Sequence, residues 1–141
     1  MKSTKKLRGT GVAITTPFHK DGNINFKGFK KLLEHLIAGK VDYLVPLGTT
    51  GESVTLTRDE KIAVLDFVVE VVDKRVPIVA GVGGNNTQEV LKCLSEYDFS
   101  GVDAILSVTP YYNRPSQKGL YQHYKMIVNE SPVPVILYNV P

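Results

Sequence analysis

Short runs of Val, Ile and Leu recur along the chain at intervals of roughly 30 residues, separated by longer stretches with a helical period. These apolar runs are predicted strands at residues 11–16, 43–47, 78–81, 104–108 and 135–138. They are apolar almost throughout, which is typical of strands that are covered on both faces. The pattern therefore predicts a sheet of parallel strands joined by helices.

Four amphipathic stretches lie between the predicted strands. Residues 26–38 place Phe26, Phe29 and Leu33 on one face and end at Gly39, a residue type that often terminates helices. The second stretch opens at Thr57 and runs to about residue 73; Glu60, three residues on, completes a capping-box pattern. The third and fourth are predicted to begin near Thr87 and Ser116.

Two α/β architectures compete for this alternation: a doubly wound open sheet and a (β/α)8 TIM barrel. A dinucleotide-binding open sheet needs a Gly-x-Gly-x-x-Gly turn after an early strand, and the nearest match, residues 81–86, lacks the last glycine. No Walker-type loop is present either. The barrel is favoured. A complete barrel needs ~250 residues, so residues 1–141 are predicted to be the N-terminal portion of one TIM-barrel domain.

Charge adds a basic N-terminal tail to this picture. The net charge is +3, but Lys2, Lys5, Lys6 and Arg8 all lie within residues 1–9. Without these four of the 17 basic residues, the 14 acidic residues leave the body at −1. No zinc-finger spacing or RNA-binding signature accompanies the tail, so we expect no nucleic-acid partner.

Several other classes of protein are disfavoured. No apolar run approaches the ~18 residues of a membrane span, and the single Cys93 cannot form an internal disulfide, which fits a cytoplasmic protein. His19, His35 and His123 lack metal-ligand spacing, so we expect no metal or other cofactor. Residues 51–55 miss the last glycine of a serine-hydrolase elbow.

Hydroxyl groups cluster where barrel enzymes place their chemistry, after the carboxyl ends of strands. Thr49 and Thr50 lie between two glycines, a turn whose amides and hydroxyls suit a small carboxylate or phosphate. Tyr112 and Tyr138 follow the fourth strand and end the fifth, and a Tyr–Thr–Tyr chain could carry a proton. Each feature alone also fits a turn or ordinary packing; their predicted convergence on one rim favours a function.

Three segments resemble one enzyme family. Residues 48–53, 109–115 and 137–141, which read GTTGES, TPYYNRP and LYNVP, are similar to the dihydrodipicolinate synthase family of pyruvate-dependent class I aldolases. The likeness extends over nearly the whole chain after Leu7. The sibling N-acetylneuraminate lyases share the first turn but generally lack the Tyr-Tyr-Asn-Arg-Pro context.

The resemblance implies a lyase of the diaminopimelate and lysine pathway. In this family a barrel lysine forms a Schiff base with pyruvate, and the resulting enamine attacks L-aspartate 4-semialdehyde. Tyr138 matches the general acid/base, Thr49 and Tyr112 match its relay partners, and Thr50 matches the residue that holds the pyruvate carboxylate. The Tyr112 equivalent reaches into a neighbouring subunit, which implies a tight dimer that usually pairs into a homotetramer.

Some family members are inhibited by lysine at that dimer interface. The matching positions here are Ser53, Val54, Arg58, Lys61, Asn85, Glu89 and Tyr111. Arg58 and Lys61 stand where some lysine-sensitive members carry histidines, and two further cations would repel a lysine ligand. The resemblance therefore predicts weak or absent lysine inhibition.

The residue that forms the Schiff base in this family lies on the sixth strand, outside the predicted elements. Lys20, Lys40 and Lys74 are predicted in loops and the other lysines in helices or the tail, so none ends a strand in a desolvated pocket. We expect the 141-residue chain alone to be inactive. It is either the N-terminal part of such a synthase or of a sibling sugar-acid aldolase, or a non-catalytic half-barrel module.

Overall fold

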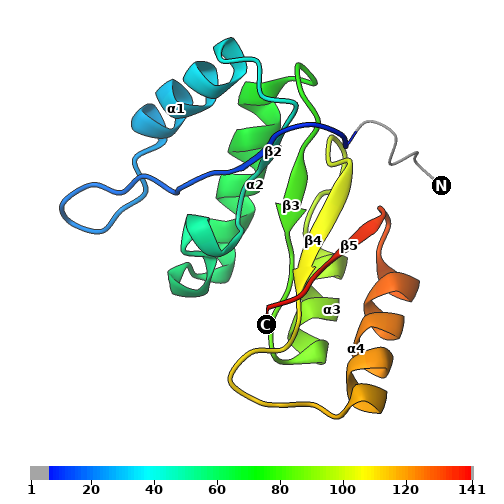
Figure 1. Ribbon diagram of the computed structural model, residues 1–141. Coiled ribbons are helices and arrows are strands. Elements are labelled where there is room, and N and C mark those ends of the chain that lie inside the picture. The colour runs from blue at the N-terminus through cyan, green and yellow to red at the C-terminus, as the bar shows by residue number, and fades with distance from the viewer. Residues whose placement is uncertain (1–6, 141) are drawn as a thin grey trace.

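The computed structural model describes residues 7–140, in which strands and helices alternate as the sequence predicts. Figure 1 follows the chain through them. The strands are β1 (Gly11–Ala13), β2 (Tyr43–Val45), β3 (Val79–Gly81), β4 (Ala104–Val108) and β5 (Val135–Tyr138). The helices are α1 (Phe26–Ala38), α2 (Arg58–Val72), α3 (Thr87–Glu96) and α4 (Gln117–Glu130), with 3-10 turns η2 (Thr49–Gly51) and η3 (Ser53–Thr55).

The order of the strands distinguishes between the two competing architectures. β1 pairs in parallel with β2, and β3, β4 and β5 pair in parallel in that order, with a bridge between Leu44 and Ile78 joining the two groups. A doubly wound sheet reverses its strand order part-way, whereas consecutive order with crossovers of one hand keeps all helices on one side. The described residues therefore form an arc of a TIM barrel, without closing it (Figure 1).

Three predicted strands are shorter in the structure than in the sequence pattern, and β3 differs only in beginning at Val79 instead of residue 78. β2 ends at Val45 because Pro46 has no amide hydrogen and Leu47 adopts a left-handed backbone with φ +59°. β1 ends at Ala13, yet the Ile14 amide still donates to the Val45 carbonyl at 3.1 Å. Burial thus continues past the regular ladder, which is why the apolar run overestimates the strand.

The predicted helix starts are confirmed by their caps. Thr57 and Glu60 form the expected capping box, with the Thr57 amide donating to Glu60 Oε2 at 2.7 Å and the Glu60 amide to Thr57 Oγ1 at 3.3 Å. These hydrogen bonds hold the pKa of Glu60 below its usual range. Ser116 likewise caps α4 by accepting from the Gly119 amide at 3.2 Å. The residues that cap α2 and α4 could therefore be predicted from the sequence.

The core lies between the strands and the inner faces of the helices. Phe29 and Leu33 of α1 are buried, as the helical period predicts, and Val64, Leu65 and Val68 of α2 are buried with them. Full burial of side chains of this size stabilises the fold by ~1.5–3 kcal/mol each. This layer fixes the helices against the strands whose carboxyl ends carry the polar loops.

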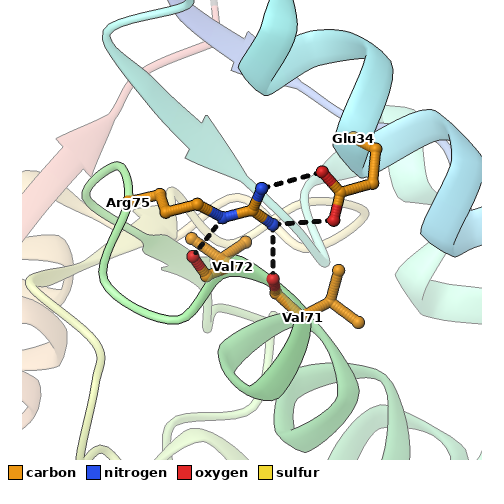
Figure 2. Close-up of polar contacts among 4 residues, drawn as sticks. All are labelled: Glu34, Val71, Val72 and Arg75. Atoms are coloured by element: carbon orange, nitrogen blue, oxygen red, sulfur yellow. Dashed lines mark hydrogen bonds and ion pairs between the residues drawn. The ribbon is translucent and has the colours of Figure 1, made fainter.

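A surface clasp joins α1 to the end of α2. Figure 2 shows Arg75 donating two hydrogen bonds to the Glu34 carboxylate, at 2.7 and 2.8 Å. The same guanidinium donates to the carbonyls of Val71 and Val72 in the last turn of α2, and the Val72 carbonyl also accepts from the Arg75 amide at 3.0 Å. The Arg75 hydrogen bonds also hold the pKa of Glu34 below its usual range. The clasp anchors the C-terminal end of α2, opposite the end that carries the candidate site.

Most of the predicted basic tail, residues 1–9, lies outside the described residues. Where the description begins, Leu7 packs against Val45, Val79 and Ala104. The Thr10 amide then donates to Asp42 at 2.6 Å. The segment just after the lysines is therefore held against the strands.

Candidate active site

The turn after β2 carries the two threonines and is rigidly built. Thr16 donates from its hydroxyl to the Gly51 carbonyl at 2.8 Å, and both residues are buried. Glu52 has a left-handed backbone with φ +52° and joins the two 3-10 turns. Thr49 and Thr50 remain exposed on η2. The turn thus presents two hydroxyls at the carboxyl end of β2 on a fixed backbone.

A cavity of about 750 Å³ opens beside this turn. Its walls come from η2, η3, α2, the loop after β3, α3 and the ends of β4 and β5. The residues singled out from the sequence that line it are Thr49, Ser53, Val54, Arg58, Lys61, Asn85, Glu89, Tyr111 and Tyr138. The predicted acid/base position, one relay position and all seven positions of the lysine site therefore share one continuous space.

Thr50 and Tyr112 are not part of this wall. Thr50 is exposed beside Thr49 on η2, and Tyr112 is 100% exposed with a left-handed backbone at φ +70°. The expected convergence of four hydroxyls thus brings Thr49 and Tyr138 to one cavity, while the Tyr112 ring faces solvent in the single chain. Of the adjacent pair Tyr111 and Tyr112, only Tyr111 lines the cavity.

Residues 109–116, between β4 and α4, form a loop that contains Tyr111 and Tyr112 and is called the tyrosine loop below. Hydrogen bonds hold this loop to the segments around it. The Asn113 side-chain amide donates to the Asn85 carbonyl at 3.1 Å, and the Thr109 amide donates to the Tyr138 carbonyl at 2.9 Å. Tyr124 of α4 donates its hydroxyl to the Ser107 carbonyl on β4 at 3.1 Å. The loop between β4 and α4 is therefore fixed to the loop after β3 and to the end of β5.

An ion pair that sequence reasoning missed lies in the cavity wall. Arg58 at the start of α2 contacts Glu96 at the end of α3, with Nε to Oε2 at 2.6 Å. Lys92 and Cys93 line the same stretch of wall, and Cys93 packs half-buried against the core. The spacing of Glu89, Lys92 and Glu96 at three and four residues was the available signal, because such residues share one helix face.

Tyr97 is the buried tyrosine of this cavity wall, and burial is the main influence on its pKa. Tyr97 follows α3, and burial raises its pKa well above the usual value, with a further contribution from the hydrogen bond to Cys93. Tyr97 is therefore a neutral wall residue at ordinary pH.

The described residues contain no lysine at the end of a strand, no cluster of metal ligands and no membrane-spanning helix. Every lysine between residues 7 and 140 lies in a turn or a helix, as predicted, and none ends a strand. Over the same residues, no three His, Cys, Asp or Glu side chains group closely enough to hold a metal ion. None of the helices described is long and apolar enough to cross a bilayer.

The family model for the dihydrodipicolinate synthetase family matches residues 6–141. The chain belongs to this family. Among its relatives, the 4-hydroxy-tetrahydrodipicolinate synthase of Flavobacterium psychrophilum is 53% identical over 133 residues, which are 94% of this chain and 45% of that protein. The chain thus spans about half the length of the curated relatives that it matches.

Solved structures of the family superpose closely on the described arc. The dihydrodipicolinate synthase of Acinetobacter baumannii, solved with pyruvate, matches with a TM-score of 0.90 and 47% identity, over 94% of this chain and 46% of that one. The enzyme of Cyanidioschyzon merolae, solved with lysine bound, matches with a TM-score of 0.87 and 34% identity, over 94% and 46%. The predicted TIM-barrel fold class is confirmed by these neighbours.

Proposed function

We propose that this chain supplies the pyruvate-binding turn and the proton relay of a 4-hydroxy-tetrahydrodipicolinate synthase. The observation that carries the proposal is the placement of Thr49 and Tyr138, from the ends of β2 and β5, in the wall of one cavity. In the proposed reaction pyruvate condenses with L-aspartate 4-semialdehyde through a Schiff base on a lysine, and membership of the family supports this assignment. In this family that lysine belongs to the sixth strand, beyond the residues of this chain.

Each residue has a defined task in this mechanism. The Thr50 hydroxyl and the amides of its turn bind the pyruvate carboxylate. Tyr138 donates and accepts the protons of Schiff-base formation, which its neutral phenol can do only when hydrogen-bonded in a relay. Thr49 and Tyr112 continue that relay toward solvent. No cofactor is required, because the covalent imine itself serves as the electron sink.

The exposure of Tyr112 supports assembly of the synthase from more than one subunit. A fully exposed tyrosine in a left-handed backbone gains nothing within its own chain. Insertion into the cavity of a second subunit would complete that subunit's relay. The proposed enzyme is therefore a homo-oligomer, a tight dimer that pairs into a tetramer, and it acts in the cytoplasm.

Trapping with borohydride tests the proposal. We compare the 141-residue chain with a chimera in which the remaining C-terminal part of the F. psychrophilum relative follows Pro141. After incubation with pyruvate and borohydride, intact mass should show one adduct on the chimera and none on the chain alone. Between residues 7 and 140 the chain offers only lysines in turns and helices, and none of them ends a strand.

Peptide mapping of the adduct provides the decisive control. The modified lysine should lie in the grafted part, and pyruvate should be required for its modification. A stoichiometric adduct on a lysine of residues 1–141, or a well-folded chimera that forms no adduct, would contradict the proposal.

The same cavity also contains the proposed regulatory site, with an altered charge. Glu89, Asn85 and Tyr111 can receive the charged ends of an amino acid. The Arg58 charge is compensated by Glu96, whereas Lys61, which also lines the cavity, has no salt bridge among the described residues. Lys61 is therefore the cation that most strongly opposes binding of a lysine effector.

We expect the chimera to be insensitive to lysine at low-millimolar concentration. Lys61→His should increase the inhibition by removing an uncompensated cation, and Arg58→His should increase it as well, because it frees the Glu96 carboxylate in the cavity wall to attract the lysine effector. Initial rates at rising lysine concentrations measure this, with Lys118→His on α4 as the control substitution. Strong inhibition of the unmodified chimera would refute the expectation.

A further inference from the structure

A buried histidine joins α4 to the start of α3. His123 is 5% exposed, and its Nδ1 lies 2.8 Å from the Thr87 hydroxyl. Its other ring nitrogen, Nε2, is buried without a hydrogen-bond partner in residues 7–140. The proposed synthase mechanism uses neither residue. A buried polar group of this kind requires an explanation.

Protonation of His123 would be costly in this position. A neutral imidazole has one N–H and one lone pair, so either tautomer can bond the Thr87 hydroxyl through Nδ1. An imidazolium has two N–H groups, and the one on Nε2 would be buried, charged and without an acceptor. Protonation would therefore leave a charged donor at Nε2 buried and unsatisfied, which disfavours the packed position of the ring against Thr87.

The surroundings of the ring do not offset this cost. The facing groups are the Thr87 hydroxyl from α3 and, on α4 itself, the Tyr124 phenol, whose ring centre is 5.3 Å away. Burial lowers the pKa of His123, and burial likewise raises that of Tyr124. No charged side chain of residues 7–140 contributes to the lowering of the His123 pKa.

The Thr87 end of this contact leads directly to the cavity wall. Thr87 is the first residue of α3, after Asn86, whose side chain caps the helix by accepting from the Gln88 amide at 3.0 Å. Asn85 precedes them in the wall and accepts the hydrogen bond of Asn113 from the tyrosine loop. A displacement of Thr87 would therefore be passed to both loops.

We propose that His123 is a pH-sensitive positioning residue: its neutral ring holds Thr87 and the cavity-lining loop before it, and its protonation releases that loop. The inference does not depend on aldolase chemistry, since it concerns the order of the wall and not turnover. It assigns to α4 a control over the loops that border the cavity.

The direction of the pH effect follows from linkage. The folded pKa of His123 lies below the ordinary histidine value of about 6.5. Its contribution to stability is therefore complete above about pH 6.5 and is lost as the pH falls toward the folded value. The state in which His123 holds Thr87 and the state in which the loop is released differ by one bound proton. The equilibrium between them therefore shifts by up to about tenfold per pH unit.

Hydrogen–deuterium exchange with mass spectrometry tests the proposal on the 141-residue chain. Exchange of the segment around residues 83–92 is measured at about pH 7.5 and about pH 5.5, on either side of histidine's ordinary pKa. After correction for intrinsic rates, the segment should lose protection at the lower pH. His123→Gln, a neutral side chain that can still bond Thr87, should abolish that loss. Thr87→Val, which keeps the shape without the hydroxyl, should lower protection at both pH values.

The matched control is His35→Gln, an exposed histidine on α1, which should retain the full pH-dependent loss. A ring-proton titration of His123 by NMR, which needs no variant, provides an independent measurement. The proposal is overturned if His123 titrates at or above the ordinary value, or if the segment is equally protected at both pH values. A pH-dependent loss that persists in His123→Gln would assign the effect to other groups and overturn it as well.

Discussion

Replacing Gly81 by alanine should prevent the chain from folding. Gly81 lies on β3 where the end of β2 passes closest, and its amide donates to the Pro46 carbonyl at 2.8 Å. A Cβ added there would lie 2.1 Å from the Leu47 carbonyl oxygen and 2.7 Å from the Gly48 amide nitrogen. These are backbone atoms, so two strands would have to separate, at a cost above the usual ~1–3 kcal/mol of overpacking. Natural domains are stable by only ~5–15 kcal/mol.

Circular dichroism during urea unfolding measures this effect. Gly84→Ala is the matched control, since a Cβ there meets only Val90 Cγ2 at 3.5 Å, an ordinary contact. We expect Gly84→Ala to unfold much like the unsubstituted chain, and Gly81→Ala to show no cooperative transition. An unchanged midpoint for Gly81→Ala would mean that β2 and β3 do not approach as described.

Tyr138→Phe should lower the turnover of the chimera by about 10²–10⁴-fold, the range expected for loss of a positioned acid/base group. Tyr138 ends β5, is 37% exposed and lines the cavity with Thr49. The phenyl ring keeps the packing, so the loss should appear in kcat with little change in folding. Steady-state rates with both substrates, together with a melting curve, separate the two effects.

Tyr121→Phe provides the control for loss of a tyrosine hydroxyl. Tyr121 is an exposed residue of α4 that does not line the cavity, so its variant should retain normal turnover. If Tyr138→Phe retained full activity while folding normally, the relay proposed for Thr49, Tyr112 and Tyr138 would be wrong.

The helices and the later strands could be predicted from sequence because local chemistry specifies them. The capping box at Thr57 and Glu60 marks the start of α2 to the residue, and β4 and β5 have the predicted bounds. The exceptions are positions where the backbone, and not the side-chain pattern, decides. Leu47, within the predicted second strand, adopts a left-handed backbone conformation. An apolar side chain gives no sign of this conformation in the sequence.

The candidate site was only partly predictable for a related reason. Its members after strand ends, such as Thr49 and Tyr138, follow from barrel geometry. The pair of Arg58 and Glu96 spans 38 positions in sequence and depends on how the end of α3 lies against the start of α2. The buried contact of His123 with Thr87 likewise requires knowledge of helix packing, which a single helical period does not contain.

In the proposed synthase, Tyr112 is a position where folding and catalysis impose opposite demands. Its left-handed backbone costs a non-glycine residue ~1–2 kcal/mol, and its ring buries no surface within its own chain. Optimising this sequence for stability alone would therefore place glycine at position 112. In the proposed synthase, that choice would remove the side chain that each subunit contributes to its neighbour. Under the proposed assembly, Tyr112 destabilises the subunit that carries it and contributes to the reaction in its neighbour.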